Sequence, residues 1–440
     1  MTDDIRALAG GFPALSPQDW RPLAEKALRG ADFEETLSRT TVDGINRGPV
    51  FFNRPPGAHA VDAAPRDIHL PWGMRQTLVE ATPEAANAAA LSDLMGGVSE
   101  LELRLDPEGR FGLKANDVDL MDAALKGVDL TLAPIHLDSL GGQGHHAHVF
   151  LTLMARRRVD GEQIEGGLGI SPVERAARQG VVLDDQCFPK AIEIAQLAHA
   201  AFPNLKIFRA DAALAFETGG SEVQELAMMA ASAATYIRLA LKAGLDADAA
   251  ARSVEARLVA DTDIHLTIAK LRAASARKIF RLGKAAWAAG GADAITVRPL
   301  TEAIGRPTPF ARRVARNLHI LLAEESHLGK VTDPAAGSYL HESLADALAQ
   351  KAWALFQEIE GKGGLASALS SEWFQSEIAK SRRAHLNRYE AGSDQILGVT
   401  QYVDPDPRAV ETDGDWPDDD LPACALAPIR FAAQFEEAAQ

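Results

Sequence analysis

The sequence has 440 residues, of which 47% are hydrophobic and 24% charged, a composition typical of a folded globular protein that excludes a wholly disordered chain. Its 61 acidic residues outnumber its 45 basic ones, and the net charge of −16 disfavours nucleic acid or an anionic membrane as a partner. With two cysteines and no Cys-x-x-Cys pair, we expect neither a disulfide framework nor a cysteine metal site, and the cytoplasm is the expected compartment. The N-terminus has no basic start and no long apolar run, which predicts neither a signal peptide nor a membrane anchor.

Residues 1–64 are expected to form an N-terminal arm. One short helical pattern, PQDWRPLAEKAL, precedes a long stretch that is rich in turn formers and poor in periodicity. This stretch has no core of its own, yet the arm carries residues of the buried type: Trp20, Phe33, Val50 and Phe51. We therefore expect the arm to pack on the main domain or on a partner subunit.

Residues 65–348 are expected to form an α/β domain, a TIM-type (β/α) barrel. Short apolar runs alternate there with Ala-rich helical patterns, which is typical of repeated strand and helix units around a parallel sheet. Helical patterns over 223–244 and 309–326 are long enough to cover a sheet, so a barrel is preferred to an open dinucleotide-binding sheet. The predicted strands, seven or eight in number, cover residues 101–105, 128–135, 166–171, 206–212, 263–266, 294–299 and 330–333.

Two of these helices have clear start signals. Ser221 with Gln224 forms a capping-box pattern, and Thr308 before Pro309 places a cap ahead of a residue that suits the first helical turn. Residues 349–440 are expected to form a C-terminal helical extension, with helices over 349–360 and 371–387. An acidic, Pro-rich linker or exposed tail is expected to follow over 404–423.

Motifs for chemistry are weak. The run GGQGHH at 141–146 lacks the spacing of a phosphate-binding loop and is expected to be a loop. A solvated turn is favoured over a metal site for the histidines there, His145, His146 and His148, and for nearby His136. The run DPAAGSY at 333–339 follows the last predicted strand, where barrels place ligand loops, yet a turn before a helix explains it equally well. No G-x-S-x-G or paired cysteine indicates a nucleophile.

A family resemblance adds what these patterns cannot. Six blocks, in the same order as in the family, cover the chain from about Trp20 to about Val403 and together resemble methylmalonyl-CoA mutases. The blocks are KALRGADFEETLSRTTVDGI, PWGMRQ, ETGGSEVQELA, IAKLRAA, PFARRVARNLHILLAEES and VTDPAAGSYLHESLA. The resemblance implies a barrel of the type that receives a CoA ester along its axis, with adenosylcobalamin held against one end by a separate flavodoxin-like domain.

The resemblance also shows where this chain departs from catalytic members. The family's D-x-H-x-x-G cobalamin-ligand motif does not occur, because the nearest strings, at Asp67 and Asp263, lack the glycine. We therefore expect no cofactor on this chain and adenosylcobalamin on a partner. The family's catalytic histidine corresponds to Leu214, which can neither donate a hydrogen bond to a thioester nor act as a general acid. No catalytic residue and no metal site are assigned.

Two further departures concern substrate binding and the barrel itself. At the family's substrate block, a tyrosine, an arginine and a final tyrosine are replaced by Asp67, Leu70 and Thr77. Three residues persist as candidate, vestigial substrate-binding residues: Trp72, Arg75 and Gln76. The resemblance also implies that one strand–helix unit is missing between 280 and 294, so the barrel is expected either to close with seven strands or to have a gap.

Taken together, the departures predict a partner protein, not an enzyme that is catalytic by itself. The expected function is that of the non-catalytic small subunit of an adenosylcobalamin-dependent methylmalonyl-CoA mutase. It would form a heterodimer with a large catalytic subunit, support propionate metabolism in the cytoplasm and bind acyl-CoA weakly or not at all. The alternatives are a substrate-binding subunit of an acyl-CoA mutase that works with a separate cobalamin-binding chain, and a regulatory or assembly protein that uses the same fold.

Overall fold

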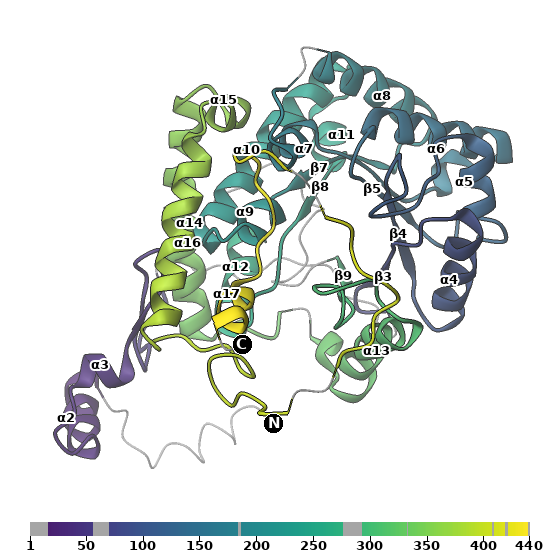
Figure 1. Cartoon of the computed structure of the whole chain (residues 1–440). Helices are drawn as coiled ribbons and strands as arrows, with labels where there is room; N and C mark the ends of the chain where they lie inside the picture. Colours follow the sequence, from purple (N-terminus) through teal and green to yellow (C-terminus); the bar gives the residue numbers. More distant parts are fainter. Residues whose placement is uncertain are drawn as a thin grey trace, which may run out of the picture.

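Seven parallel strands form a central sheet that curls into a half-barrel (Figure 1). The computed structural model describes residues 16–55, 70–183, 186–275, 293–331, 333–406, 409–418 and 421–438. The strands are β3 (Gly73–Leu78), β4 (Glu100–Leu105), β5 (Ile135–Ser139), β6 (Gly166–Ile170), β7 (Lys206–Asp211), β8 (Val254–Arg257) and β9 (Ala294–Thr296). Their order across the sheet is β8-β7-β6-β5-β4-β3-β9.

The strand order is that of a (β/α) barrel with one break. In a closed barrel of this type each strand pairs with its successor and the last strand pairs with the first. Here the last strand, β9, pairs with the first, β3, in the register Gly73 to Ala294 and Arg75 to Thr296. Among the described residues the ring is interrupted between β8 and β9. Residues 276–292, which precede β9 in the chain, are not among the described residues. The expected TIM-type barrel is confirmed as an incomplete barrel of seven strands among the described residues.

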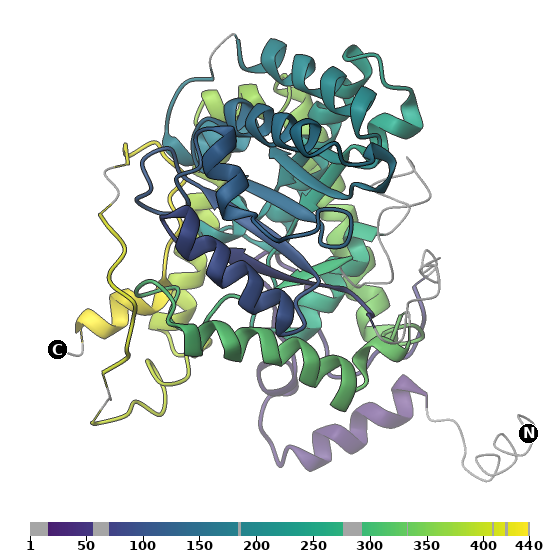
Figure 2. The same cartoon turned by 90° about the vertical axis from the view of Figure 1, so that its right-hand side faces the viewer.

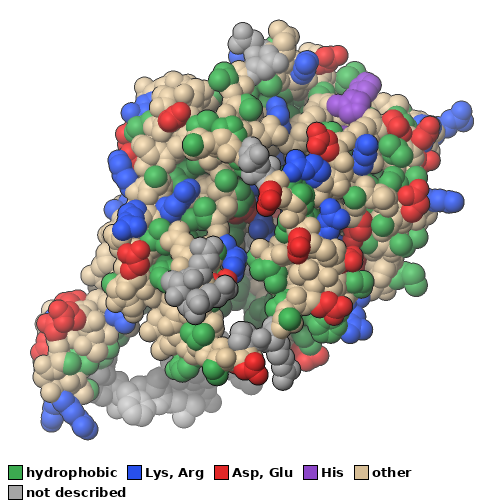
Figure 3. Space-filling view, in the orientation of Figure 1, with side chains coloured by type: hydrophobic (Ala, Val, Ile, Leu, Met, Phe, Trp, Pro, Cys, Tyr) green, Lys and Arg blue, Asp and Glu red, His purple; other side chains and the backbone are tan. Residues whose placement is uncertain are grey.

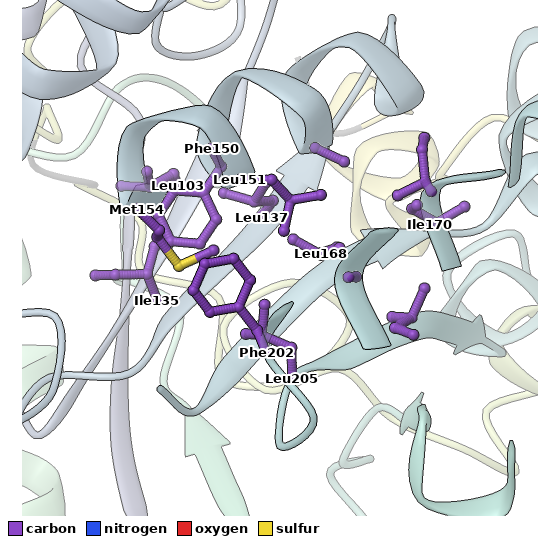
Figure 4. Packing of buried hydrophobic residues seen from close by; sticks show 14 of the residues in the cluster. Leu103, Ile135, Leu137, Phe150, Leu151, Met154, Leu168, Ile170, Phe202 and Leu205 are labelled. Carbon is purple, nitrogen blue, oxygen red and sulfur yellow. The ribbon is translucent and has the colours of Figure 1, made fainter. Parts of the chain in front are cut away.

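A ring of helices covers the outer face of the sheet (Figure 2). These helices are α4 (Pro83–Met95), α5 (Val118–Ala124), α6 (Gln143–Arg157), α8 (Cys187–Ala201), α10 (Glu222–Lys242), α11 (Ala247–Arg252) and α13 (Pro309–Ile320). Apolar side chains of the strands, such as Leu103 and Leu137, pack there on Phe150 and Met154 of α6 (Figure 4). Each such fully buried side chain contributes on the order of 2 kcal/mol.

A second apolar cluster joins α10 to the C-terminal helices. Its helices are α7 (Pro172–Gln179), α9 (Ala213–Glu217), α12 (Ile264–Ser275), α14 (Tyr339–Gly361), α15 (Leu365–Ser370) and α16 (Trp373–Glu390). Buried residues include Leu226 of α10, Leu348 of α14 and Phe374 of α16. Helix α10 therefore lies between the sheet and the C-terminal extension, which explains why both of its faces are apolar. None of the described helices is long and apolar enough to cross a membrane.

The strand predictions were confirmed in part. Strands β6, β7 and β9 lie within predicted runs, although β9 ends at Thr296, and β4 begins one residue before its predicted run, at Glu100. The run 128–135 is mostly a turn and contributes its last residue to β5, while 263–266 contains the start of α12. The described residues of 330–333 form no strand. Strands β3 and β8 were missed because GMRQTL and VEAR carry few apolar side chains.

The helix starts follow their signals at most positions. Ser221 and Gln224 form the capping box of α10, and Thr308 caps α13. The expected loop at 141–146 was wrong, because Gly142 adopts a φ of +65° and α6 begins at the next residue. The described DPAAGSY residues form a turn with Gly337 at a φ of +81°, and α14 begins at Tyr339, before the expected 349.

The described part of the arm is tied to the body at its root, and its first helices project from the body (Figures 1 and 2). Helices α2 (Pro17–Ala27) and α3 (Phe33–Leu37) precede the short strands β1 (Arg39–Thr40) and β2 (Asn46–Arg47), which pair antiparallel. No residue of α2 is buried. At the root, Ile45 is buried in the second cluster, and the Asp43 carboxylate accepts hydrogen bonds from the Ser221 hydroxyl and the Val223 amide.

Replacing Arg312 by methionine is expected to lower the free energy of unfolding by about 3 kcal/mol. Arg312 is buried, donates to the Thr77 carbonyl at 2.9 Å and pairs with the buried carboxylate of Asp93, so it ties α13 to β3 and α4. Urea unfolding would measure the loss. The matched control is Arg313→Met, an exposed position on the same helix, which should change stability by less than about 0.5 kcal/mol. Equal losses in the two variants would contradict the assignment.

Candidate functional site

Charged side chains cover the inner face of the half-barrel. Side chains alternate between the two faces of a strand. In β4 the leucines point into the apolar core, so Glu100, Glu102 and Arg104 lie on the inner face, and β5 places His136 and Asp138 there. Three further strands add to the same face: β3 with Arg75 and Thr77, β7 with Arg209 and Asp211, and β8 with Glu255 and Arg257.

Arg209 is the centre of this charged face. Its side chain is 2% exposed, and its guanidinium contacts Glu255 at 2.7 Å, Glu102 at 3.3 Å and Asp138 at 3.5 Å. One cation therefore holds together carboxylates from three strands, β8, β4 and β5. A buried arginine of this kind is tolerated only because carboxylates surround it.

A second group of ion pairs lies toward the carboxyl ends of the strands. Arg257 binds Asp211 at 2.7 Å and Asp138 at 3.4 Å. Arg104 binds Asp138 at 3.5 Å and reaches Glu302, from the loop after β9, at 3.2 Å. The pairs thus extend from β8 to the far side of the half-barrel.

A third group lies around His136 of β5. Its ring nitrogens are 3.4 Å from Glu100 and 3.3 Å from Glu255, and Arg75 lies 2.9 Å from its Nε2 atom. Arg75 in turn pairs with Glu100 at 2.8 Å. The imidazole is therefore enclosed by groups that already bind one another.

The network favours the ionised form of two of its buried carboxylates, Glu255 and Asp138. Burial acts to raise the pKa of Glu255, but Arg209 and the hydrogen bond from His136 hold that pKa well below its ordinary value. Burial likewise opposes ionisation of Asp138, whose pKa is nevertheless lowered by Arg257, Arg104 and Arg209. A carboxylate with a strongly lowered pKa is a poor general base near neutral pH. The cations of this face are matched by carboxylates, so the face is suited to structure more than to acid–base chemistry or phosphate binding.

The three candidate substrate-binding residues do not converge in the structure. Arg75 lies on the inner face in its ion pair with Glu100. Trp72 and Gln76 alternate with Arg75 and lie on the opposite, helix-covered side. There the Trp72 indole donates to His319 of α13 at 3.2 Å, and Gln76 is buried.

The three substituted family positions that the structure describes carry no free polar group toward the interior. Leu214 of α9 is fully buried in the second apolar cluster with Val173 and Leu226. Thr77 donates to Glu102 at 3.0 Å and so belongs to the charged face. Leu70 is 45% exposed, and Asp67 lies outside the described residues.

The histidines of the 141–146 run lie on a helix. His146 is buried in the first turns of α6, with its Nδ1 atom 3.2 Å from the Ser139 hydroxyl. Burial and the neighbouring His145 lower the pKa of His146 to about 4, so it is uncharged at neutral pH. In the described part of the chain no three or more His, Cys, Asp or Glu side chains are grouped so that they could hold a metal ion.

The C-terminal tail crosses the mouth of the half-barrel at the carboxyl ends of the strands (Figure 1). The Trp416 indole donates to the Glu302 carbonyl at 2.7 Å and stacks on Phe111, from the loop after β4, at 6.5 Å. These two contacts of Trp416 hold the acidic 404–423 stretch on the body at this point. The same face of the molecule has acidic and basic side chains interspersed over it, with no large area of one sign (Figure 3).

The tail then reaches the opposite side of the mouth. The Leu426 amide donates to the Ala177 carbonyl of α7 at 2.8 Å, and the Ile429 amide donates to the Glu217 carbonyl of α9 at 2.9 Å. Glu217 also pairs with Arg298 from the loop after β9. The described residues of the tail, together with this ion pair, cover the end of the barrel at which barrel enzymes place their ligand sites.

Sequence comparisons place these observations in a family. The family model for methylmalonyl-CoA mutase matches residues 68–282 and 276–417. The methylmalonyl-CoA mutase small subunit of Streptomyces virginiae is 31% identical, over 99% of this chain and 78% of that one. The small subunit from Propionibacterium freudenreichii is 30% identical, over 93% of this chain and 73% of that one. A protein of Cereibacter sphaeroides named methylmalonyl-CoA mutase is 26% identical, over 87% of this chain and 64% of that one. The chain belongs to the methylmalonyl-CoA mutase family.

Proposed function

We propose that this chain is a non-catalytic small subunit that binds a large catalytic subunit and supports the conversion of methylmalonyl-CoA to succinyl-CoA. The relatives named as small subunits support the pairing, since that name implies a larger partner. The observation that carries the proposal is the inner face of the half-barrel. Its arginines are already bound to carboxylates, so binding the phosphates of a CoA ester would require several buried ion pairs to be broken.

Adenosylcobalamin would be bound by the partner. The groups at the mouth of this half-barrel do not fit that cofactor, because Glu217 and Arg298 bind each other and the tail lies across them. Leu214 offers no polar atom for a thioester oxygen. We therefore derive no catalytic step for this chain.

The arm is the part of the chain that suits a partner. Beside α2 it has a hollow of about 370 Å³ with an aromatic lining that includes Trp20, Phe33 and Phe52. The ring centre of Trp20 lies 5.9 Å from that of Phe33 and 5.8 Å from that of Phe52. The aromatic residues therefore fix each other's positions without burying α2. Leu23 is 56% exposed and Val50 43% exposed on the same arm. Apolar side chains displayed on a projecting segment are typical of a protein interface.

Mixing this chain with the large mutase subunit of its own organism is expected to give a one-to-one complex. Size-exclusion chromatography with light scattering would measure its mass. Leu23→Ser should weaken the complex about tenfold, since it removes apolar area from the arm. Gln18→Ser, at another exposed position of α2, is the matched control and should leave affinity unchanged. If the two subunits elute separately at micromolar concentration, the pairing is wrong.

The chain alone is expected to bind methylmalonyl-CoA too weakly to detect, with a dissociation constant above about 1 mM by calorimetry. The large subunit, titrated in the same way, is the positive control. No mutase turnover is expected when this chain is mixed with an isolated cobalamin-binding module. Turnover by that pair would instead favour a substrate-binding subunit served by a separate cobalamin chain.

A further inference from the structure

Two imidazoles meet at the N-terminal ends of α12 and α14. The Nδ1 atom of His265 lies 3.2 Å from the Nε2 atom of His341, with ring centres 5.3 Å apart and ring planes at 41°. Both side chains are partly exposed. The pair joins the segment at Asp263 with the end of the DPAAGSY run, two stretches to which the proposed function gives no role.

The spacing of the two nitrogens is close to that of two ligands on one metal ion. Two imidazoles bound to a tetrahedral ion at roughly 2.0–2.1 Å have ligating nitrogens about 3.3 Å apart and ring centres about 5.2 Å apart. Two rings joined head-on by a straight hydrogen bond of 3.2 Å would have centres about 5.5 Å apart. The observed separation of 5.3 Å lies between these two values, so two rings in hydrogen-bond contact here are also spaced as two ligands of one ion would be.

The surroundings orient the His341 ring for this role. The Nδ1 atom of His341 lies 2.8 Å from the Ser338 hydroxyl, which leaves Nε2 directed at His265. Metal-binding histidines commonly have their second ring nitrogen held by a hydrogen bond of this kind. Burial, together with His265 and Arg272, lowers the pKa of His341, which favours the uncharged ring that binds a metal.

The neighbouring carboxylates are engaged elsewhere, which limits the class of metal. Asp263 pairs with Arg47 of the arm, Asp333 pairs with Arg272, and Glu342 pairs with Arg54 at 2.7 Å. The protein ligands would therefore be two imidazole nitrogens, with water at the open positions. Imidazole ligands suit Zn²⁺, Ni²⁺, Cu²⁺ and Co²⁺, whereas Mg²⁺ and Ca²⁺ require oxygen ligands.

We propose that His265 and His341 form a two-histidine site for a divalent transition-metal ion, which cross-links α12 and α14 beside the root of the arm. The site lies between two arm contacts, Arg47 with Asp263 and Arg54 with Glu342. An ion bound here would hold together the two helices on which the arm is anchored. The proposal does not depend on the subunit function proposed above.

Titration of chelator-treated, full-length chain with Zn²⁺ is the test. Calorimetry should give one ion per chain at pH 7.5. His265→Ala and His341→Ala should each weaken binding about tenfold or more and abolish the rise in melting temperature that Zn²⁺ gives to the wild type. Co²⁺ bound to the wild type should show the visible absorption of a low-symmetry imidazole site.

The matched control is the double variant His145→Ala, His148→Ala, which removes two exposed histidines from α6 and should bind Zn²⁺ as the wild type does. Circular dichroism of the metal-free variants checks that each has folded. The proposal is overturned if the wild type shows no binding up to about 1 mM Zn²⁺. It is also overturned if a folded His265→Ala, His341→Ala variant retains wild-type affinity.

Discussion

The buried guanidinium of Arg209 sets the main constraint on this half-barrel. Taking an arginine out of water costs several kcal/mol, so it must be surrounded by carboxylates, and those carboxylates must come from the strands that meet around it. Glu255, Glu102 and Asp138 meet that requirement from β8, β4 and β5. The inner face is therefore one on which charged side chains of neighbouring strands bind one another.

The same network explains how a barrel with one break holds its shape. The described edges of β8 and β9 have no strand between them, yet the two sides of the break are joined by side chains. Arg104 of β4 reaches Glu302 after β9, and Arg298 after β9 reaches Glu217 after β7. The tail adds backbone hydrogen bonds on both sides of the mouth. Ion pairs and an extended segment thus link parts of the barrel that a complete ring of strands would hold together.

The sequence predicted the parts of the fold that depend on apolar patterning and helix caps. Runs such as LELRL and the Ser221 capping box were found because their local signals agree with the tertiary structure. Strand β8 was missed because VEAR places Glu255 and Arg257 inward, which reverses the usual expectation for a buried strand. The network could have been suspected from alternate charges in ELELR, IHLD and VEAR. Which charged residues pair with one another could not have been predicted, because pairing across the inner face depends on strand order and register.

The positions at which this chain departs from the catalytic pattern lie in different surroundings. A histidine at position 214 would enter an apolar cluster with Val173 and Leu226, where its ring would be desolvated. Arg75 would still be bound to Glu100, and the tail would still lie across the mouth. The arm combines a firmly anchored root with exposed apolar side chains, features that the proposed binding of a partner subunit would use.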